Sequence, residues 1–487
     1  MKNKIINIIL ISILGALVLG CTEDLMDMEP TSVITPEQIA TSSSALESTV
    51  NGFYSAMYAY PSDIGRHNLF GQKGVGLSLD FFTGDVTSVG GNEWFSHMMI
   101  GLHWLETYYL NSYFWEYYYG IIKEANGMLD GFPEVPSDPD IQSYYAQALT
   151  LRAHSYFYLI NLFQEPYAID KTAPGVPIYT SLSQSDGSRS TVDSVYNQII
   201  ADLELANSVF ETATPGSNTE INADVAKGLL AQVLMFTGDY ENAAKLANEA
   251  RANYTLMSES DYESGFNSVN NPEWMWGTVV TDLSVTDWAN WTSHMNNDGP
   301  GYAGYGAYKQ MDTLLYALID DNDYRKKRFN LLQDSTINAI TNPIIADKFT
   351  SVSPEKQYGD LLYMRASEMY LIEAEALARD NKEDLAKPVL DELIKERCGG
   401  TNPYNTDALS GDDFLEAIRT QARIELWGEG KVAFYAKRYQ STLQRGSNSY
   451  VSFGGETYAF NDPMFLMQIP KDEIDNNPNI SNEDQNP

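Results

Sequence analysis

Apolar side chains recur at helical spacing over most of the chain beyond residue 35. Residues 226–237 show the pattern clearly, with apolar positions three or four residues apart: Ala226, Leu229, Leu230, Val233 and Leu234. Such a stripe lies on one face of an α-helix and predicts that this face is buried. Gly238 follows the stripe, and glycine commonly ends helices. A second helix is predicted to follow over 240–250.

The same arrangement occurs again at 361–397. Ala231 and Ala243, which let the first two helices approach closely, are twelve positions apart. Ala374 and Ala386 repeat that spacing in the second segment. The spacing resembles that of a tetratricopeptide repeat, whose unit is a helix–turn–helix pair. Further helices are predicted over 45–58, 104–130, 141–163, 191–210 and 412–427.

Two regions lack a helical stripe and are predicted to be rich in loops. Residues 60–102 contain many glycines, and four of the eight tryptophans fall between 274 and 291. A short strand is expected at 272–276. Loops held by a rigid scaffold are where binding residues concentrate.

The predicted fold class is therefore mainly α, with tetratricopeptide-like helical pairs, a large loop-rich region and few short strands. We divide the folded part into three portions of one integrated fold. They are an N-terminal helical portion at 36–263, a loop-rich ligand-binding region at 264–360, and a C-terminal helical portion with a closing segment at 361–487.

The N-terminus has the pattern of a secretory signal peptide. Residues 1–20 begin with lysines, continue as an apolar run and end in a small residue before Cys21. The run is too short for a comfortable membrane-spanning helix. Residues 17–21, Leu-Val-Leu-Gly-Cys, resemble a bacterial lipobox, which predicts lipidation of Cys21; the alternative is an ordinary signal with a chance cysteine. Residues 21–35 are predicted to be the tether.

Composition excludes several classes of protein. Acidic residues outnumber basic ones by 66 to 31, which gives a formal net charge of −35. This balance argues against nucleic acid as a partner, because phosphate binding requires a basic surface. Only two cysteines are present, so neither a disulfide framework nor a multi-cysteine metal site is expected. Cys398 is expected to be buried or inert.

None of the catalytic or metal motifs is convincing. Residues 299–304 match G-x-G-x-x-G, but they neither follow a predicted strand nor open a helix, as a dinucleotide site requires. His154 lies in a helix predicted to be buried. Residues 320–323 lack the twelve-residue calcium-loop pattern, so calcium would bind there only by chance geometry, and no metal or cofactor is predicted. Carboxylate pairs are frequent among 66 acids and leave glycoside hydrolysis open.

Five segments spread over the chain carry a further signal. They are residues 45–54, 114–126, 151–163, 423–430 and 469–479. Taken in this order, they resemble the SusD/RagB family of outer-membrane nutrient-binding lipoproteins of Bacteroidetes. The match runs over nearly the whole chain, although Ala436 stands where the family usually has Asp and Gln468 where it usually has Pro.

The resemblance implies a fold, a location and a function. The fold would be a SusD-like superstructure of tetratricopeptide-like pairs covered by a loop-rich region. The protein would be a lipoprotein of the outer membrane that faces the cell exterior, and Glu23 and Asp24 resemble the signal for that location. Without catalysis, it would capture an oligosaccharide or polysaccharide and deliver it to a SusC-like TonB-dependent transporter. The alternatives are a binder of peptides or other nutrients, a secreted glycoside hydrolase, and a structural scaffold.

Two loop segments have the mixture of side chains that sugars require. A sugar offers apolar C–H faces, which suit aromatic rings, and polar edges, which suit Asn, Asp or Arg. The predicted ligand-binding residues are Asn92, Trp94, Trp288, Asn290, Trp291, His294, Tyr302 and Tyr305. For the three tryptophans the alternative is that each ring only anchors its loop.

Overall fold

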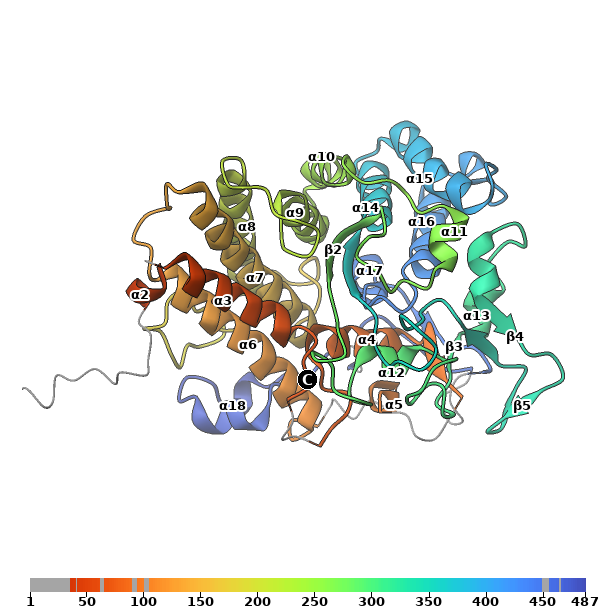
Figure 1. The fold of residues 1–487 in the computed structure, drawn as a ribbon, viewed down its shortest axis with the longest axis horizontal. Helices are drawn as coiled ribbons and strands as arrows, with labels where there is room; N and C mark the ends of the chain where they lie inside the picture. The colour runs from red at the N-terminus through yellow and green to blue at the C-terminus, as the bar shows by residue number, and fades with distance from the viewer. Residues whose placement is uncertain are drawn as a thin grey trace, which may run out of the picture.

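The computed structural model describes residues 36–40, 42–61, 65–89, 94–99, 105–448, 455–463 and 466–487. The predicted signal peptide, the tether with Cys21, and Asn92 lie outside the described residues. Helices dominate the described part and strands are short, as Figure 1 shows. The predicted mainly α fold class is confirmed.

Helices form the scaffold and pair along the chain. The longer ones are α3 (Ser43–Ala56), α4 (Gly71–Thr83), α6 (Tyr109–Leu129), α7 (Pro139–Phe163), α8 (Val192–Phe210), α9 (Ala223–Thr237), α10 (Tyr240–Arg251), α14 (Ala366–Arg379), α15 (Glu383–Arg397), α16 (Asp412–Glu425) and α17 (Val432–Tyr439). The short ones are α2 (Pro36–Ala40), α5 (Ser96–Met99), α11 (Glu259–Glu263), α12 (Trp291–Met295), α13 (Thr313–Tyr316) and α18 (Lys471–Asn476). Each helix from α6 to α10 packs on the next, α10 packs on α14, and α14 packs on α15 and α16 (Figure 1).

The predicted repeats are present as helix pairs. The first is α9 with α10, and the second is α14 with α15. The side chain of Asn222 caps α9 by accepting from the N–H groups of Asp224 and Val225, and Gly238 ends the helix at φ +87°. Glycine suits this end because its φ is positive. The second repeat begins later than predicted, because Leu361–Arg365 is a strand, β8.

Short strands join the two loop-rich regions. β2 (Trp274–Thr278) pairs antiparallel with β8, which confirms the strand expected at 272–276. A four-stranded sheet has the order β1-β3-β7-β4, made of β1 (Val86–Ser88), β3 (Lys309–Met311), β7 (Ile344–Ala346) and β4 (Phe329–Leu331). Two-stranded ladders pair β5 (Thr336–Ile337) with β6 (Ile340–Thr341) and β9 (Leu443–Gln444) with β10 (Thr457–Tyr458). Since β1 comes from the first loop-rich region and β3 from the second, the two regions are held together.

The prediction that 60–102 is rich in loops missed one long helix, α4. All thirteen residues of this helix are buried. Its apolar residues Val75, Leu77, Leu79 and Phe81 are two positions apart, a spacing that favours a strand, and its three glycines lower helix propensity, so the sequence does not indicate a helix. The glycines of α4 allow other segments to pack closely against the helix. A Cβ added to Gly430, at φ +79°, would lie 2.5 Å from the Cα of Gly76 in α4.

A cluster of buried charges joins the strands to the C-terminal helices. We call it the ion cluster; its cations are Arg325, Arg365, Arg397 and Lys348, and its anions are Asp323, Glu273, Glu425 and Glu429. Glu425 is central, since its carboxylate accepts from three arginines at 2.6–2.8 Å. Burial alone would raise the pKa of Glu425, but the guanidinium groups of Arg397, Arg365 and Arg325 hold it well below its ordinary value. Four positive and four negative charges balance inside the protein.

Candidate ligand-binding site

Four of the predicted ligand-binding residues lie together at the protein surface. They are Trp94, Trp288, Tyr302 and Tyr305, and we call them the aromatic surface. The rings of Trp288 and Tyr305 are stacked with their centroids 5.4 Å apart, and the ring of Tyr302 stands edge-on to that of Trp288 at 5.3 Å. Tyr302 is also edge-on to Trp94 at 6.3 Å. Tyr305 is 70% exposed and Trp288 38%, while Trp94 and Tyr302 are half-buried.

Trp288 has a backbone conformation that bulky residues seldom adopt. Its φ is +66°, in the left-handed region. Its N–H donates to Oε1 of Gln357 at 2.7 Å, and the neighbouring Lys356 forms an ion pair with Asp282 at 2.8 Å. Strained conformations of this kind persist where the surroundings fix them, and they cluster at functional sites. The contacts around Trp288 therefore fix its backbone in this conformation.

His67 contacts both Trp94 and Tyr302 of the aromatic surface, although the sequence analysis did not single it out. Its ring stacks on Trp94 with centroids 5.6 Å apart, and its Nδ1 is 2.9 Å from the hydroxyl of Tyr302. The ring of Tyr60 packs edge-on against it at 5.6 Å. No motif marks His67, because its partners are 27 and 235 residues away in the chain. Only the fold brings these rings together.

Asn290 and Trp291 are buried beneath the aromatic surface. The side chain of Asn290 caps α12 by accepting from the N–H of Ser293 at 2.9 Å. The ring of Trp291 packs edge-on against Phe349, and the Lys73 ammonium lies over it, 4.5 Å from its centroid. In this structure both side chains therefore support α12 and are not presented to a ligand.

His294 is also fully buried. Its ring stacks between Phe70 and Tyr302, with centroids 5.6 and 4.8 Å away, and its Nε2 is 2.9 Å from the carbonyl oxygen of His67. Burial, followed by the charge of Lys309, holds the pKa of His294 well below its ordinary value, so the ring is neutral at pH 7. The ring of His294 thus packs against Tyr302 and supports it. Direct ligand contact stays a prediction for the aromatic surface and for Asn92, which lies outside the described residues.

Other titratable groups noted in the sequence have structural partners. Asp323 is buried and paired with Arg325 at 2.5 Å, and Asp321 pairs with Lys326 at 2.7 Å. Cys398 is buried, and burial raises the pKa of its thiol to about 12. Within the described ranges, no group of three or more His, Cys, Asp and Glu side chains is placed to hold a metal ion.

Comparison with known proteins identifies the family. A model described as "SusD family" matches residues 341–487, and one described as "Starch-binding associating with outer membrane" matches residues 71–235. The chain is 24% identical to the SusD-like protein P2 of Formosa agariphila in an alignment 530 positions long, which covers 98% of both chains.

Solved structures show the same likeness. A SusD-like carbohydrate binding protein from Bacteroides vulgatus superimposes with a TM-score of 0.78 at 27% identity, over 91% of this chain and 98% of that chain. A putative sugar binding protein from the same species gives 0.75 at 24% identity with the same coverage.

The helical pairs and the small sheets form the fold that this chain shares with these SusD-like structures. Together with the two family-model matches, they show that the chain belongs to the SusD family. The description of the second model associates the family with the outer membrane. None of the helices in the described part is both long and apolar enough to cross a membrane.

Proposed function

We propose that this protein binds a glycan, an oligosaccharide or polysaccharide, on the aromatic surface, and that it does so without catalysis. The observation that carries the proposal is the pair of stacked, exposed rings of Trp288 and Tyr305, continued by the edge-on rings of Tyr302 and Trp94. Sugar rings present apolar C–H faces that pack on such platforms. Membership of the SusD family, whose relatives include a protein described as carbohydrate binding, supports the same class of ligand.

The first experiment replaces single rings of the aromatic surface. Trp288→Ala and Tyr305→Ala should each weaken glycan binding by about 1–2 kcal/mol, which is roughly 5- to 30-fold in Kd, because each removes one stacking face. Binding would be measured by calorimetry against a panel of soluble glycans. Leu283→Ala is the matched control, since Leu283 is in the same loop and is 99% exposed but lies outside the aromatic surface.

The outcomes separate the proposal from its alternatives. If the double variant of Trp288 and Tyr305 binds the glycan as well as the unchanged protein, the site is wrong. If no glycan binds but members of a peptide library do, the protein is a binder of other nutrients. If the bound oligosaccharide becomes shorter during prolonged incubation, the protein is a hydrolase.

We further propose that Cys21 is lipidated, that the protein faces the cell exterior, and that it passes its ligand to a SusC-like TonB-dependent transporter. Family membership and the lipobox-like residues 17–21 support this proposal. Cys21→Ala should release the protein from the outer membrane, and affinity purification of the unchanged protein from detergent extracts should recover the transporter. Retention of the Cys21→Ala variant, or purification without a transporter, would contradict the corresponding part.

A further inference from the structure

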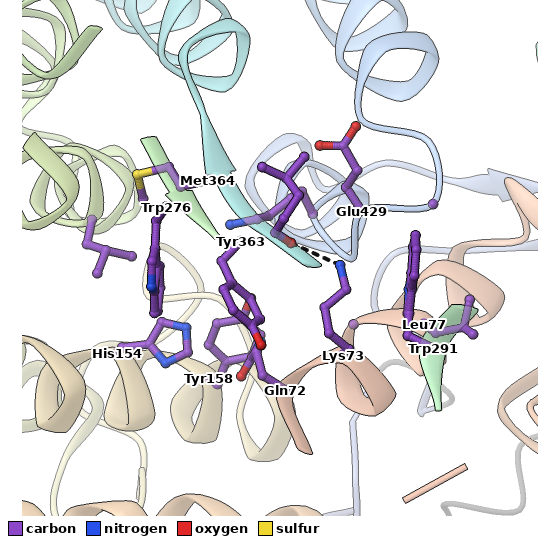
Figure 2. Close-up of a pocket in the computed structure, with 15 residues that line it drawn as sticks. Gln72, Lys73, Leu77, His154, Tyr158, Trp276, Trp291, Tyr363, Met364 and Glu429 are labelled. Atoms are coloured by element: carbon purple, nitrogen blue, oxygen red, sulfur yellow. Dashed lines mark hydrogen bonds between the residues drawn. The ribbon is translucent and has the colours of Figure 1, made fainter. Parts of the chain in front are cut away.

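A small cavity lies in the protein interior where α4, α7, β2 and β8 meet (Figure 2). Its volume is about 20 Å³. All of its lining residues except the half-buried Glu429 are buried. One wall is Trp291, the first residue of α12, so the cavity adjoins the support of the aromatic surface.

Three polar atoms of the lining have no hydrogen-bond partner among the described residues. They are Nδ1 of His154, Nε1 of Trp276 and the hydroxyl of Tyr363. The three side chains are neighbours, because the ring centroids of His154 and Trp276 are 6.0 Å apart and those of Trp276 and Tyr363 are 4.9 Å apart. Figure 2 shows Trp276 next to His154, with Tyr363 between these two side chains and Lys73. Buried polar atoms are almost always bonded to protein or to ordered water, so three unpartnered atoms around one cavity require a common explanation.

A fourth polar group lies at the other side of the same cavity. The ammonium of Lys73 donates to the carbonyl oxygen of Leu362 at 3.0 Å and lies 4.5 and 5.9 Å from the ring centroids of Trp291 and Tyr363. An ammonium has three N–H donors, and burying one without partners is costly. A further hydrogen-bond acceptor in the cavity would therefore stabilise the buried ammonium of Lys73.

We propose that this cavity is a binding site for one buried water molecule, which bonds to Trp276, Tyr363 and His154 on one side and is within reach of Lys73 on the other. The volume fits, since a cavity needs roughly 10–15 Å³ to hold one water. The chemistry fits as well. The indole N–H can only donate, while the neutral imidazole nitrogen and the phenol hydroxyl can donate or accept, and water serves both kinds of partner. Burial lowers the pKa of His154 to about 3, which keeps the imidazole neutral.

A crystal structure at about 1.5 Å resolution tests the proposal directly. One ordered water is expected in the cavity, within hydrogen-bond distance of at least two of the three unpartnered atoms. A second crystal soaked in bromide would distinguish water from a small anion held by Lys73. Either an empty cavity or an anomalous bromide peak inside it would overturn the proposal.

A pair of variants tests it in solution. Tyr363→Phe should lower Tm by about 1–3 °C, because it removes a partner of the water. Tyr262→Phe is the matched control; the hydroxyl of Tyr262 is also buried and unpartnered among the described residues, but Tyr262 does not line the cavity. Removing an unsatisfied hydroxyl should leave Tm unchanged or raise it. If Tyr363→Phe behaves in that way too, no water is bound to its hydroxyl.

Discussion

Replacement of Glu425 by Gln is the sharpest test of how the scaffold is held together. The substitution keeps the shape of the side chain and removes one negative charge from the ion cluster. The carboxylate lies at 2.6–2.8 Å from Arg325, Arg365 and Arg397, and all four side chains are buried. The variant leaves four buried cations facing three anions, and it places an amide N–H₂ beside guanidinium donors.

The expected loss follows from burial. Removing one partner of a buried ion pair costs about 3–5 kcal/mol, because the charge that remains is uncompensated. For a chain of this length the unfolding entropy is roughly 1 kcal/mol/K, so Tm should fall by only about 3–5 °C. Urea denaturation at pH 7 reads the free energy of unfolding more directly than Tm does. Because the pKa of Glu425 is held below its ordinary value, its contribution is present above about pH 4.5 and is lost as the pH falls below that.

A second glutamate on the same helix supplies the control. Glu416 forms two hydrogen bonds with Arg419, at 2.6 and 2.8 Å, but its side chain is 53% exposed. Glu416→Gln should change the free energy of unfolding by less than about 1 kcal/mol, because exposed pairs are solvated and contribute little. If Glu425→Gln costs no more than Glu416→Gln, the ion cluster does not hold the scaffold as argued.

Two further predictions concern packing and pH. Gly430→Ala should lower the free energy of unfolding, measured in urea, by about 2–4 kcal/mol, because the new Cβ meets Gly76. Gly400 has a similar positive φ but open space around an added Cβ, so Gly400→Ala should cost only about 1 kcal/mol. Equal losses in the two variants would contradict the close-packing argument. Burial and the charge of Lys431 lower the pKa of His154 to about 3. Below about pH 6.5 the unfolded chain therefore takes up a proton that the folded chain does not bind, and the free energy of unfolding falls by about 3 kcal/mol at pH 4.5. Between pH 7 and 4.5, the free energy of unfolding of His154→Gln should therefore fall by about 3 kcal/mol less than that of the unchanged protein. Identical losses in the two proteins would refute the lowered pKa of His154.

The amphipathic helices could be predicted from the sequence because each has one buried face. The alanine spacing in 226–250 predicts the α9–α10 pair, and the residues around Trp274 and Trp276 predict a strand from the local sequence alone. α4 could not be predicted by the same reasoning. Between Val75 and Phe81 its apolar residues are two apart, a spacing that favours a strand, and Gly71–Thr83 contains three glycines, which lower helix propensity.

The candidate site, too, could be predicted from the sequence only in part. Trp94, Trp288, Tyr302 and Tyr305 could be selected because aromatic rings flanked by polar and glycine residues are unusual. Burial of Trp291, only three residues beyond Trp288, could not be foreseen. The five-residue helix α12 directs the ring of Trp291 inward. Trp288, two residues before the Asn290 cap, is instead bonded to Gln357 and stacked on the ring of Tyr305.

The ion cluster and the aromatic surface are linked by a short path of contacts. Glu425 and Glu429 flank Gly428, whose added Cβ would lie 2.6 Å from the ring of Phe349, and Phe349 packs edge-on against Trp291. Trp291 begins α12, which follows directly on the strained turn at Trp288. A residue at positive φ keeps its conformation only on a support that does not yield. This path connects the buried charges to the support of Trp288, and we infer that the ion cluster stiffens that support.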